Sequence, residues 1–305
     1  MRIGMIGLGR MGSNMTRRLL RDGHEVVAFD IDKDAVEEIA KEGATASGSP
    51  ADLITNLDTP RVVWIMVPAG EITSRTIADL GDRLEEGDVI VDGGNSRFTD
   101  TMERAEALKE KGVSLVDAGT SGGVWGLEEG YSLMVGGAPE AVAVVEPIFE
   151  TLAPPDGYAH VGPSGAGHYV KMVHNGIEYG LMQAYGEGLE LLYRSDFDID
   201  LGQVAGVWRN GSVVRSWLLD LIAKALEEDP HLESLSDHVE DSGEGRWTVQ
   251  WAVENAVPAP AIAAALFARF ASRQDASFAG KVIAALRKEF GGHAVQSIEE
   301  SGPDD

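Results

Sequence analysis

One stretch of the sequence carries several reactive side chains at helical spacing. Lys171, His174, Asn175 and Glu178 stand at positions i, i+3, i+4 and i+7, which places all four on one face of a helix. Lys171 and Glu178 are then two turns apart, about 10 Å along the axis, which is enough to bracket a small extended substrate. The neighbouring residues are apolar or glycine, so a solvated helix face with a satisfied histidine is the weaker interpretation.

An amine and a carboxyl group on one face suit acid–base catalysis. A lysine on a partly buried face loses solvation, which lowers its pKa and makes it available as a base near neutrality. A carboxylic acid in the same cleft can have its pKa raised and act as an acid. We therefore expect Lys171 and Glu178 to be catalytic, in a reaction that removes a hydroxyl proton while hydride leaves the carbon for nicotinamide.

A glycine-rich motif near the start predicts the dinucleotide. Gly7-Leu8-Gly9-Arg10-Met11-Gly12 follows an apolar run and opens a helical pattern, and Asp30 ends the next apolar run. In such a motif the free N–H groups of a helix N-terminus face the pyrophosphate, and the acid binds the adenine ribose. A structural turn in an unrelated α/β fold is the weaker alternative.

Asp30 also bears on the choice of dinucleotide. Its carboxylate can accept hydrogen bonds from both ribose hydroxyls but repels a 2′-phosphate. Asp32 adds negative charge, and no arginine follows in Asp30-Ile31-Asp32. The sequence therefore favours NAD over NADP, although Lys33 leaves the use of NADP open.

The segments that position these residues divide the chain into two parts. The first half alternates short apolar runs with amphipathic segments, which is typical of a parallel sheet with helices on both faces. From His168 onward only helical periodicity is found. We predict an α/β, Rossmann-type doubly wound parallel sheet in residues 1–164 and an all-α domain for substrate binding and oligomerisation in residues 165–305. The expected strands are Arg2–Gly7, Glu25–Asp30, Arg61–Val67, Asp88–Asp92, Ser114–Ala118, Ser132–Gly136 and Tyr158–Val161, and the expected helices include Arg10–Asp22, Asp34–Lys41, His168–Tyr193, Leu201–Asn210, Ser212–Glu228, Thr248–Glu254, Ala259–Ala271 and Ala276–Phe290.

Composition excludes several classes of function. The 305 residues include 50 acidic and 25 basic side chains, and the formal charge of −25 disfavours nucleic acid or an anionic membrane as a partner. Without cysteine the chain has no disulfide or thiolate nucleophile, and its seven histidines are too scattered to suggest a metal site. No apolar run of about 18 residues is present. We expect a cytoplasmic protein without a metal.

The residues around Lys171 resemble a known active-site helix. Lys171-Met172-Val173-His174-Asn175-Gly176-Ile177-Glu178-Tyr179 is similar to that of the decarboxylating 6-phosphogluconate dehydrogenase family, within the β-hydroxyacid dehydrogenase superfamily. The resemblance covers nearly the whole chain, and its length fits the short branch of the family. Further matching segments are Asp92-Gly93-Gly94-Asn95-Ser96, Thr120-Ser121-Gly122-Gly123, Asp241-Ser242-Gly243-Glu244-Gly245-Arg246-Trp247-Thr248, Phe267-Ala268-Arg269 and Arg287-Lys288-Glu289-Phe290-Gly291-Gly292-His293.

The resemblance implies oxidative decarboxylation of 6-phosphogluconate to ribulose 5-phosphate and CO2, a step of the pentose phosphate pathway and gluconate metabolism. It implies that Lys171 takes the 3-hydroxyl proton as hydride passes to the cofactor, and that the protonated lysine then polarises the carbonyl as CO2 leaves. Glu178 would protonate C1 of the enediol. No metal is implied, because a β-keto acid already has its electron sink.

The resemblance also implies a set of binding residues. Arginine suits the phosphate because its planar fork meets phosphate oxygens in pairs. Family members supply a C-terminal arginine and histidine from the neighbouring subunit, so Arg287 and His293 imply a homo-oligomer, a dimer or tetramer, with composite active sites. The sugar acid is expected at Asn95, Ser121, Gly122, Gly123, His174 and Asn175, the phosphate at Tyr179, Arg269, Arg287 and His293, and the cofactor at the glycine-rich motif, Asp30, Val67, Pro68, Ala69 and Asn95.

One segment departs from the family pattern. Long-branch members carry Lys-Gly-Thr-Gly-Lys-Trp-Thr where this chain has Ser242-Gly243-Glu244-Gly245-Arg246-Trp247-Thr248. The phosphate-binding lysine and threonine of that pattern have no clear counterparts. Arg246 is a candidate replacement, whereas Glu244 is an awkward neighbour for a phosphate.

Two other functions remain open from the sequence. A 3-hydroxyisobutyrate-type dehydrogenase has a similar size and fold and does not decarboxylate its substrate. That substrate has no phosphate, so Tyr179, Arg269 and Arg287 argue against it. A non-catalytic NAD-binding sensor is disfavoured because both Lys171 and Glu178 are retained.

The dispersed acidity predicts a dependence of stability on salt. Like charges spread over a folded domain repel one another, and salt screens that repulsion. We expect a halophilic protein whose free energy of unfolding rises between dilute buffer and molar KCl. Equal stability across the salt series would indicate an ordinary acidic protein instead.

Overall fold

The computed structural model describes residues 1–291 and 294, and the chain forms two compact units. The first unit contains residues 1–177 and 246–251, and the second contains residues 178–245 and the chain from Ala252 onward. The division falls within one long helix. The domain boundary expected near residue 164 stays a prediction, and each unit is described by itself.

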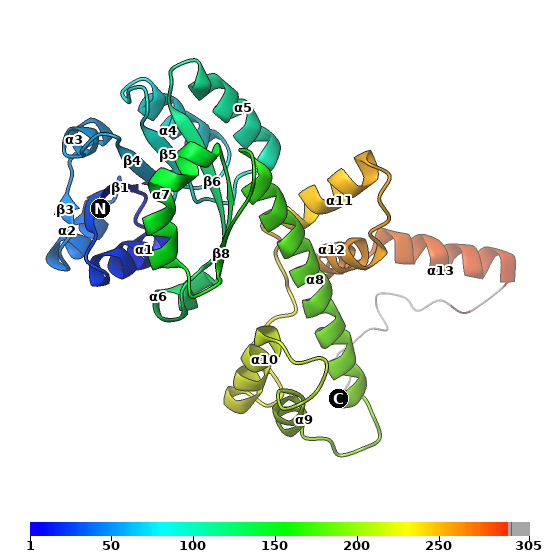
Figure 1. The fold of residues 1–305 in the computed structure, drawn as a ribbon. Helices are drawn as coiled ribbons and strands as arrows, with labels where there is room; N and C mark the ends of the chain where they lie inside the picture. Colours follow the sequence, from blue (N-terminus) through cyan, green and yellow to red (C-terminus); the bar gives the residue numbers. More distant parts are fainter. Residues whose placement is uncertain (292–293, 295–305) are drawn as a thin grey trace. The chain divides into compact units, whose positions relative to one another are not determined.

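An eight-stranded sheet forms the centre of the first unit (Figure 1). Its strand order is β3-β2-β1-β4-β5-β6-β7-β8, so the direction of winding reverses between β1 and β4. All seven predicted strands are present with slightly shifted ends. The two-residue β3 was missed, because two exposed residues carry no periodic signal. The strands are β1 (Arg2–Ile6), β2 (Glu25–Phe29), β3 (Thr45–Ala46), β4 (Val62–Ile65), β5 (Val89–Asp92), β6 (Ser114–Ser121), β7 (Ser132–Gly136) and β8 (Tyr158–Gly162).

The predicted doubly wound parallel sheet is confirmed, and it is antiparallel at one strand pair. β7 runs antiparallel to β6, with Ser132 opposite Ser121, whereas β8 returns parallel to β7. A parallel neighbour needs a crossover of about a dozen residues or more, usually a helix. The short segments η1 (Gly123–Trp125) and α6 (Gly126–Glu129) between β6 and β7 cannot make that crossover, and α7 (Pro139–Leu152) makes it between β7 and β8.

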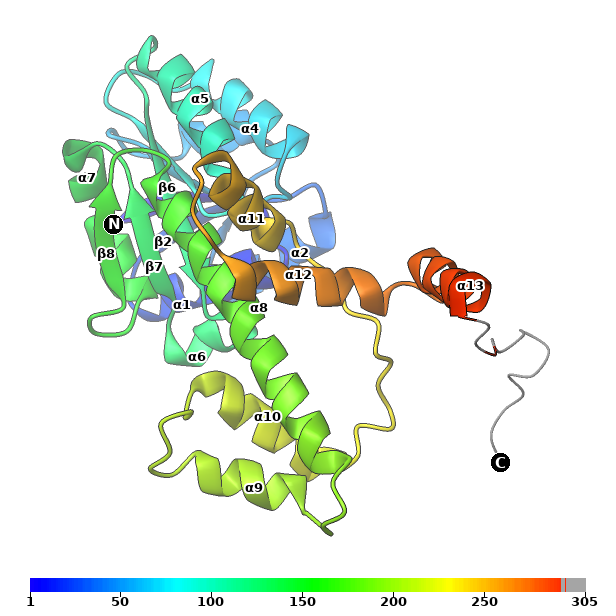
Figure 2. The ribbon, with the colours of Figure 1, turned by 90° about the vertical axis from the view of Figure 1, so that its right-hand side faces the viewer.

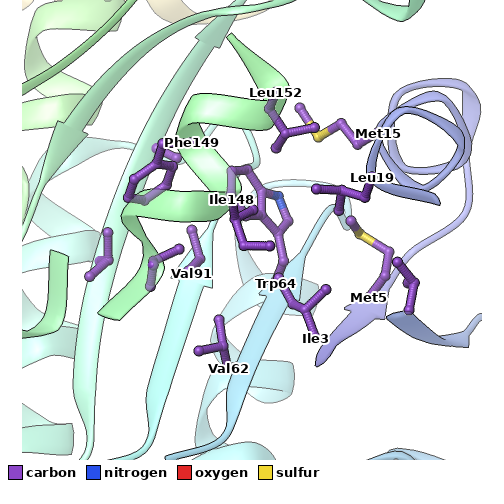
Figure 3. Packing of buried hydrophobic residues seen from close by; sticks show 14 of the residues in the cluster. Ile3, Met5, Met15, Leu19, Val62, Trp64, Val91, Ile148, Phe149 and Leu152 are labelled. Atoms are coloured by element: carbon purple, nitrogen blue, oxygen red, sulfur yellow. The ribbon is translucent and has the colours of Figure 1, made fainter. Parts of the chain in front are cut away.

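Helices cover both faces of the sheet and bury two apolar clusters. α1 (Arg10–Arg21), α2 (Lys33–Lys41) and α7 pack on one face, and α3 (Pro50–Thr55), α4 (Glu71–Gly81) and α5 (Phe98–Lys109) pack on the other. Trp64 of β4 meets Phe149 of α7 edge to face, with ring centroids 5.9 Å apart (Figure 3). Apolar strands buried on both faces hold the ends of the strands in place, and polar loops can then be built on those ends.

The described chain after β8 is helical, as predicted. α8 (Ala166–Tyr193) is one continuous helix (Figure 2). No helix among the described residues is both long and apolar enough to cross a bilayer. The remaining helices are α9 (Leu201–Trp208), α10 (Trp217–Glu228), α11 (Glu244–Glu254), α12 (Pro260–Ser272) and α13 (Phe278–Gly291).

Two of these helices begin four or five residues away from the predicted start. The helix expected from Ser212 starts at Trp217, because the Ser216 hydroxyl caps it by accepting the Leu219 N–H. The hydroxyl of Tyr185 also donates to the carbonyl of Val214, which holds the preceding segment outside the helix. The helix expected from Thr248 begins four residues earlier, at Glu244, where the glycines hid the helical pattern.

Candidate active site

The turn between β1 and α1 leaves room for a phosphate group. Gly7 has φ of +97°, and a Cβ atom on Gly12 would lie only 1.9 Å from the Gly7 carbonyl oxygen. No atom lies within 4 Å of a Cβ built on Gly9, and no side chain caps the N-terminus of α1. An open helix N-terminus with free N–H groups fits the pyrophosphate of a dinucleotide. Leu8, Arg10 and Met11 complete this turn.

Asp30 follows β2, and its carboxylate is tied to the same turn. Oδ2 accepts the Leu8 N–H at 2.5 Å, and Oδ1 accepts the Asp32 N–H at 2.8 Å. Asp32 in turn accepts the Asp34 N–H and caps α2. Each oxygen of Asp30 retains a lone pair for a ribose hydroxyl, so the residues present fit the adenosine half of NAD.

Two further loops lie at the same edge of the sheet. Val67, Pro68 and Ala69 follow β4, and Asn95 lies exposed in the loop after β5. Asp92 shapes that second loop, because its carboxylate accepts the N–H of Gly94 and, at 2.7 Å, the hydroxyl of Ser96. Since β1, β2, β4 and β5 are parallel, their carboxyl ends bring all the predicted cofactor residues to one edge, where the strand order reverses.

The start of α8 is fixed on the end of β6. The buried carboxylate of Asp117 on β6 accepts the N–H of Gly165 at 2.6 Å and of His168 at 2.8 Å. A Cβ atom on Gly167 would lie 2.4 Å from the Met134 carbonyl oxygen, so the helix touches the strands directly. Sequence analysis missed Asp117. The sequence feature that could have revealed it is a carboxylate inside the apolar run of a predicted strand.

This packing places Lys171 beside β6. A Cβ atom on Gly119 would lie 2.5 Å from the Cβ of Lys171. Lys171 is buried, its Nζ donates to Asn175 Oδ1 at 2.7 Å, and Nδ1 of His174 lies 3.0 Å from the same oxygen. Three of the four residues on the predicted face therefore meet within the first unit. Ser121 follows Gly119 by two residues on β6.

A glycine turn continues from Ser121. Gly122 has φ of +124° and Gly123 has φ of +54°, conformations that disfavour other residues. The three predicted substrate residues, Ser121, Gly122 and Gly123, therefore lie where the chain leaves β6. Lys171 packs against this same strand.

Residues of α11 also pack on α8 in this unit. Thr248 Oγ1 donates to the Met172 carbonyl oxygen at 2.8 Å. The ring of Tyr169 meets those of Phe98 and Trp251, each with centroids 5.1 Å apart, and burial raises the pKa of Tyr169. Sequence analysis placed Thr248 in a motif and at the start of a predicted helix, without this contact. Its structural role is to hold the helix that carries Lys171.

In the second unit, Tyr179 and Arg269 are in direct contact. Cζ of Arg269 lies 3.6 Å from the centroid of the Tyr179 ring, and Nη1 of Arg269 donates to the Glu240 carbonyl oxygen at 2.8 Å. The Tyr179 hydroxyl oxygen accepts the Ser242 N–H at 3.1 Å. A Cβ atom on Gly245 would lie 2.4 Å from the Tyr179 ring, which explains the glycine.

Arg273, which sequence analysis missed, pairs with two nearby carboxylates. Its Nη1 lies 2.8 Å from Glu240 Oε2 and 3.0 Å from Asp241 Oδ1. Hydrogen bonds from His238 and Arg273 hold the pKa of Glu240 below its usual range. Within residues 1–291, Arg269 forms no ion pair with a carboxylate. An arginine without such a partner, in a chain this acidic, is suited to an anion from outside.

The other predicted site residues lie on α8, α11 and α13, or outside the described residues. Glu178 is half-buried on α8, seven residues after Lys171. Arg287 is exposed on α13, and His293 lies outside the described residues. Glu244 is buried at the start of α11, whereas Arg246 is exposed. Within the part of the chain that the structure describes, no group of three or more acidic or histidine side chains is arranged to hold a metal.

Comparison with known proteins places the chain among characterised enzymes. Residues 2–162 match the family described as the NAD binding domain of 6-phosphogluconate dehydrogenase, and residues 167–299 match its C-terminal domain. The chain is 50% identical over 297 residues to an NAD(+)-dependent, decarboxylating 6-phosphogluconate dehydrogenase of Haloferax volcanii, covering 97% of this chain and 98% of that one.

Solved structures agree on the fold. The 6-phosphogluconate dehydrogenase of Plasmodium falciparum superimposes with a TM-score of 0.83 at 30% identity, over 100% of this chain and 67% of that one. The 3-hydroxyisobutyrate dehydrogenase of Mycobacterium tuberculosis superimposes with a TM-score of 0.72 at 24% identity, over 94% and 99% of the two chains, and this likeness concerns the fold alone.

The contact between β6 and α8 predicts a strong effect of one methyl group. Gly119→Ala should lower the free energy of unfolding by about 1–3 kcal/mol and reduce activity, because the new Cβ overpacks against Lys171. Gly48→Ala is the matched control, since no atom lies within 4 Å of its Cβ position. Chemical denaturation and steady-state kinetics of both variants check this. Wild-type stability and activity in Gly119→Ala would contradict the packing described.

Proposed function

The chain belongs to the 6-phosphogluconate dehydrogenase family, and on that premise we propose that it converts 6-phosphogluconate and NAD to ribulose 5-phosphate, CO2 and NADH. The observation that carries the proposal is the buried amine of Lys171, packed against β6 and hydrogen-bonded to Asn175. The reaction belongs to the pentose phosphate pathway. We place the enzyme in the cytoplasm, where soluble dinucleotides and sugar phosphates are found.

NAD is the preferred cofactor in this proposal. Bound NAD supplies the acceptor for the hydride that leaves C3 of the substrate. The turn around Gly9 would hold its pyrophosphate, and Asp30 would hold the adenine ribose. The fixed carboxylate of Asp30 would repel the 2′-phosphate of NADP, and the Haloferax volcanii relative is NAD(+)-dependent.

Lys171 and Glu178 divide the proton transfers. Lys171 takes the proton of the 3-hydroxyl group as C3 is oxidised to a ketone. The protonated amine then gives its proton to the oxygen of that ketone as the C1–C2 bond breaks, its electron pair forming the C2–C3 double bond of an enediol while CO2 leaves. Glu178 donates a proton to the carbon that lost CO2, and Lys171 takes back the proton of the hydroxyl on C3, which gives ribulose 5-phosphate. Asn175 keeps the lysine amine directed along the helix face in all of these steps.

In this proposal, Tyr179 and Arg269 bind the phosphate group of the substrate. The guanidinium of Arg269 lies over the Tyr179 ring, and Arg273 pairs with the neighbouring carboxylates of Glu240 and Asp241. Ser242, whose N–H donates to the Tyr179 hydroxyl oxygen, stands where long-branch members carry a phosphate-binding lysine. A planar, stacked guanidinium gives bidentate hydrogen bonds to a phosphate. An unphosphorylated hydroxy acid would leave this group unused, which disfavours the 3-hydroxyisobutyrate-type reaction.

A homo-oligomer completes the proposed enzyme. Four apolar side chains of α13, Phe278, Val282, Ile283 and Leu286, lie on one face and are 42–78% exposed. An exposed apolar helix face of this kind marks a protein interface. We expect the purified chain to sediment as a dimer or larger assembly, and Ile283→Glu to shift it toward the monomer. A wild-type monomer at micromolar concentration would contradict this part of the proposal.

One assay tests the reaction itself. Purified enzyme with NAD and 6-phosphogluconate should release NADH and CO2 in equal amounts, and more efficiently than with NADP. Lys171→Met should lower kcat by about 10²–10⁴-fold, because the base is lost, and Glu178→Gln should mainly slow the later proton transfers. NADH without CO2 would favour a simple dehydrogenase, neither product would favour a sensor, and near-native turnover by Lys171→Met would remove the proposed base.

Substitution of Arg269 tests the phosphate site. Arg269→Met should raise the KM for 6-phosphogluconate by about 10- to 100-fold, the range expected for a lost hydrogen bond to a charged group, and should leave the KM for NAD unchanged. Arg194→Met is the control, since the side chain of Arg194 forms, among the described residues, only an exposed ion pair with Glu190 of α8. Equal KM values for the substrate in both variants would contradict the assignment.

A further inference from the structure

Arg104 of α5 links the two loops that follow β4 and β5. Its guanidinium donates to the Ser74 hydroxyl at 2.9 Å, to the Gly70 carbonyl oxygen at 3.4 Å and to the Ser96 hydroxyl at 3.3 Å. Gly70 and Ser74 lie at the start of α4, and Ser96 lies in the loop after β5. α4 and α5 lie side by side on one face of the sheet (Figures 1 and 2). One side chain thus spans both loops.

The link is buried and charged. The side chain of Arg104 is 9% exposed and lies 3.6 Å from the carboxylate of Asp92, which is 1% exposed. Asp92 also accepts the hydroxyl of Ser96, so the two loops and α5 share one hydrogen-bonded network. A buried ion pair adds little net stability because desolvation offsets the attraction. The position that this pair gives to the two loops is therefore a better explanation for it than added stability.

The two linked loops are those predicted to hold the cofactor. Val67, Pro68 and Ala69 directly precede Gly70, and Asn95 directly precedes Ser96. The hydroxyl of Thr73 also donates to the Pro68 carbonyl oxygen, so the first of these loops is fixed from within α4 as well. A shift of Arg104 would change the separation of the two loops.

We propose that Arg104 is a positioning residue for the cofactor: it holds the loops 67–70 and 92–96 at the separation that NAD requires. The inference rests on the proposed function only for the identity of the dinucleotide. Arg104 itself contacts neither cofactor nor substrate in this proposal and acts through the loops.

The same two strands provide a matched control at their opposite ends. Arg61 precedes β4 and pairs at 3.0 Å with Asp88, which precedes β5 and is 2% exposed. This pair joins the same strands, also through a buried carboxylate, but at the amino edge of the sheet, away from the predicted cofactor loops. Its loss should affect stability alone.

The test is a titration with NADH, followed by the fluorescence of the bound nicotinamide, together with urea denaturation of each variant. Arg104→Met should weaken NADH binding about tenfold or more, because displaced loops no longer match the dinucleotide. Ser74→Ala, which removes both hydrogen bonds from Arg104 to Ser74 and keeps the ion pair with Asp92, should weaken it about threefold. Arg61→Met should lower stability and leave NADH affinity within about twofold.

Three results would overturn the inference. Arg104→Met could bind NADH like wild type while losing stability, which would make the residue structural only. Ser74→Ala could leave NADH affinity unchanged, which would refute the link to the loop after β4. This test remains valid even if Arg104→Met does not fold. Arg61→Met could weaken NADH binding as much as Arg104→Met does. Since the titration needs no substrate, failure of 6-phosphogluconate turnover by the wild type would count against the proposed function and not against Arg104.

Discussion

Helix α8 packs so closely on strand β6 that two positions of the contact have room only for glycine. Gly119 on the strand and Gly167 on the helix let the two backbones approach until the Cβ of Lys171 fills the space above Gly119. The buried carboxylate of Asp117 then satisfies two N–H groups of the first turn, which would otherwise be buried without partners. Lys171 is thereby tied to the sheet whose edge carries the dinucleotide motif, and the proposed chemistry depends on that attachment.

A second constraint comes from charge. With 50 acidic and 25 basic side chains, the protein as a whole repels the anionic substrate and cofactor proposed for it. Basic side chains near the proposed phosphate site reduce this repulsion locally. Arg273 forms ion pairs with Glu240 and Asp241. Arg269 lies over the Tyr179 ring and has no carboxylate partner in the described part of the chain. At the other site, the open N-terminus of α1 supplies N–H groups in place of basic side chains.

The features that could be predicted from the sequence are those that give a periodic pattern among neighbouring residues. The strands, the continuous helix α8 and the glycine-rich turn follow from the spacing of apolar and small residues. The antiparallel placement of β7 was not predictable in this way, because strand direction depends on whether the connection crosses the sheet. The roles of Asp117, Thr248, Arg273 and Arg104 were missed for a related reason. Each acts through a partner distant in sequence, such as Met172 for Thr248, and a single sequence does not show such pairs.

The central claim is that a helix anchored on β6 presents a lysine and a glutamate to one sugar phosphate. A crystal structure with 6-phosphogluconate and NAD bound tests it most directly. The account predicts Lys171 Nζ at hydrogen-bond distance, about 3 Å, from the 3-hydroxyl oxygen, with Glu178 directed at the carbon chain and the phosphate on Arg269. A complex in which Lys171 and Glu178 both point away from the sugar would contradict the account.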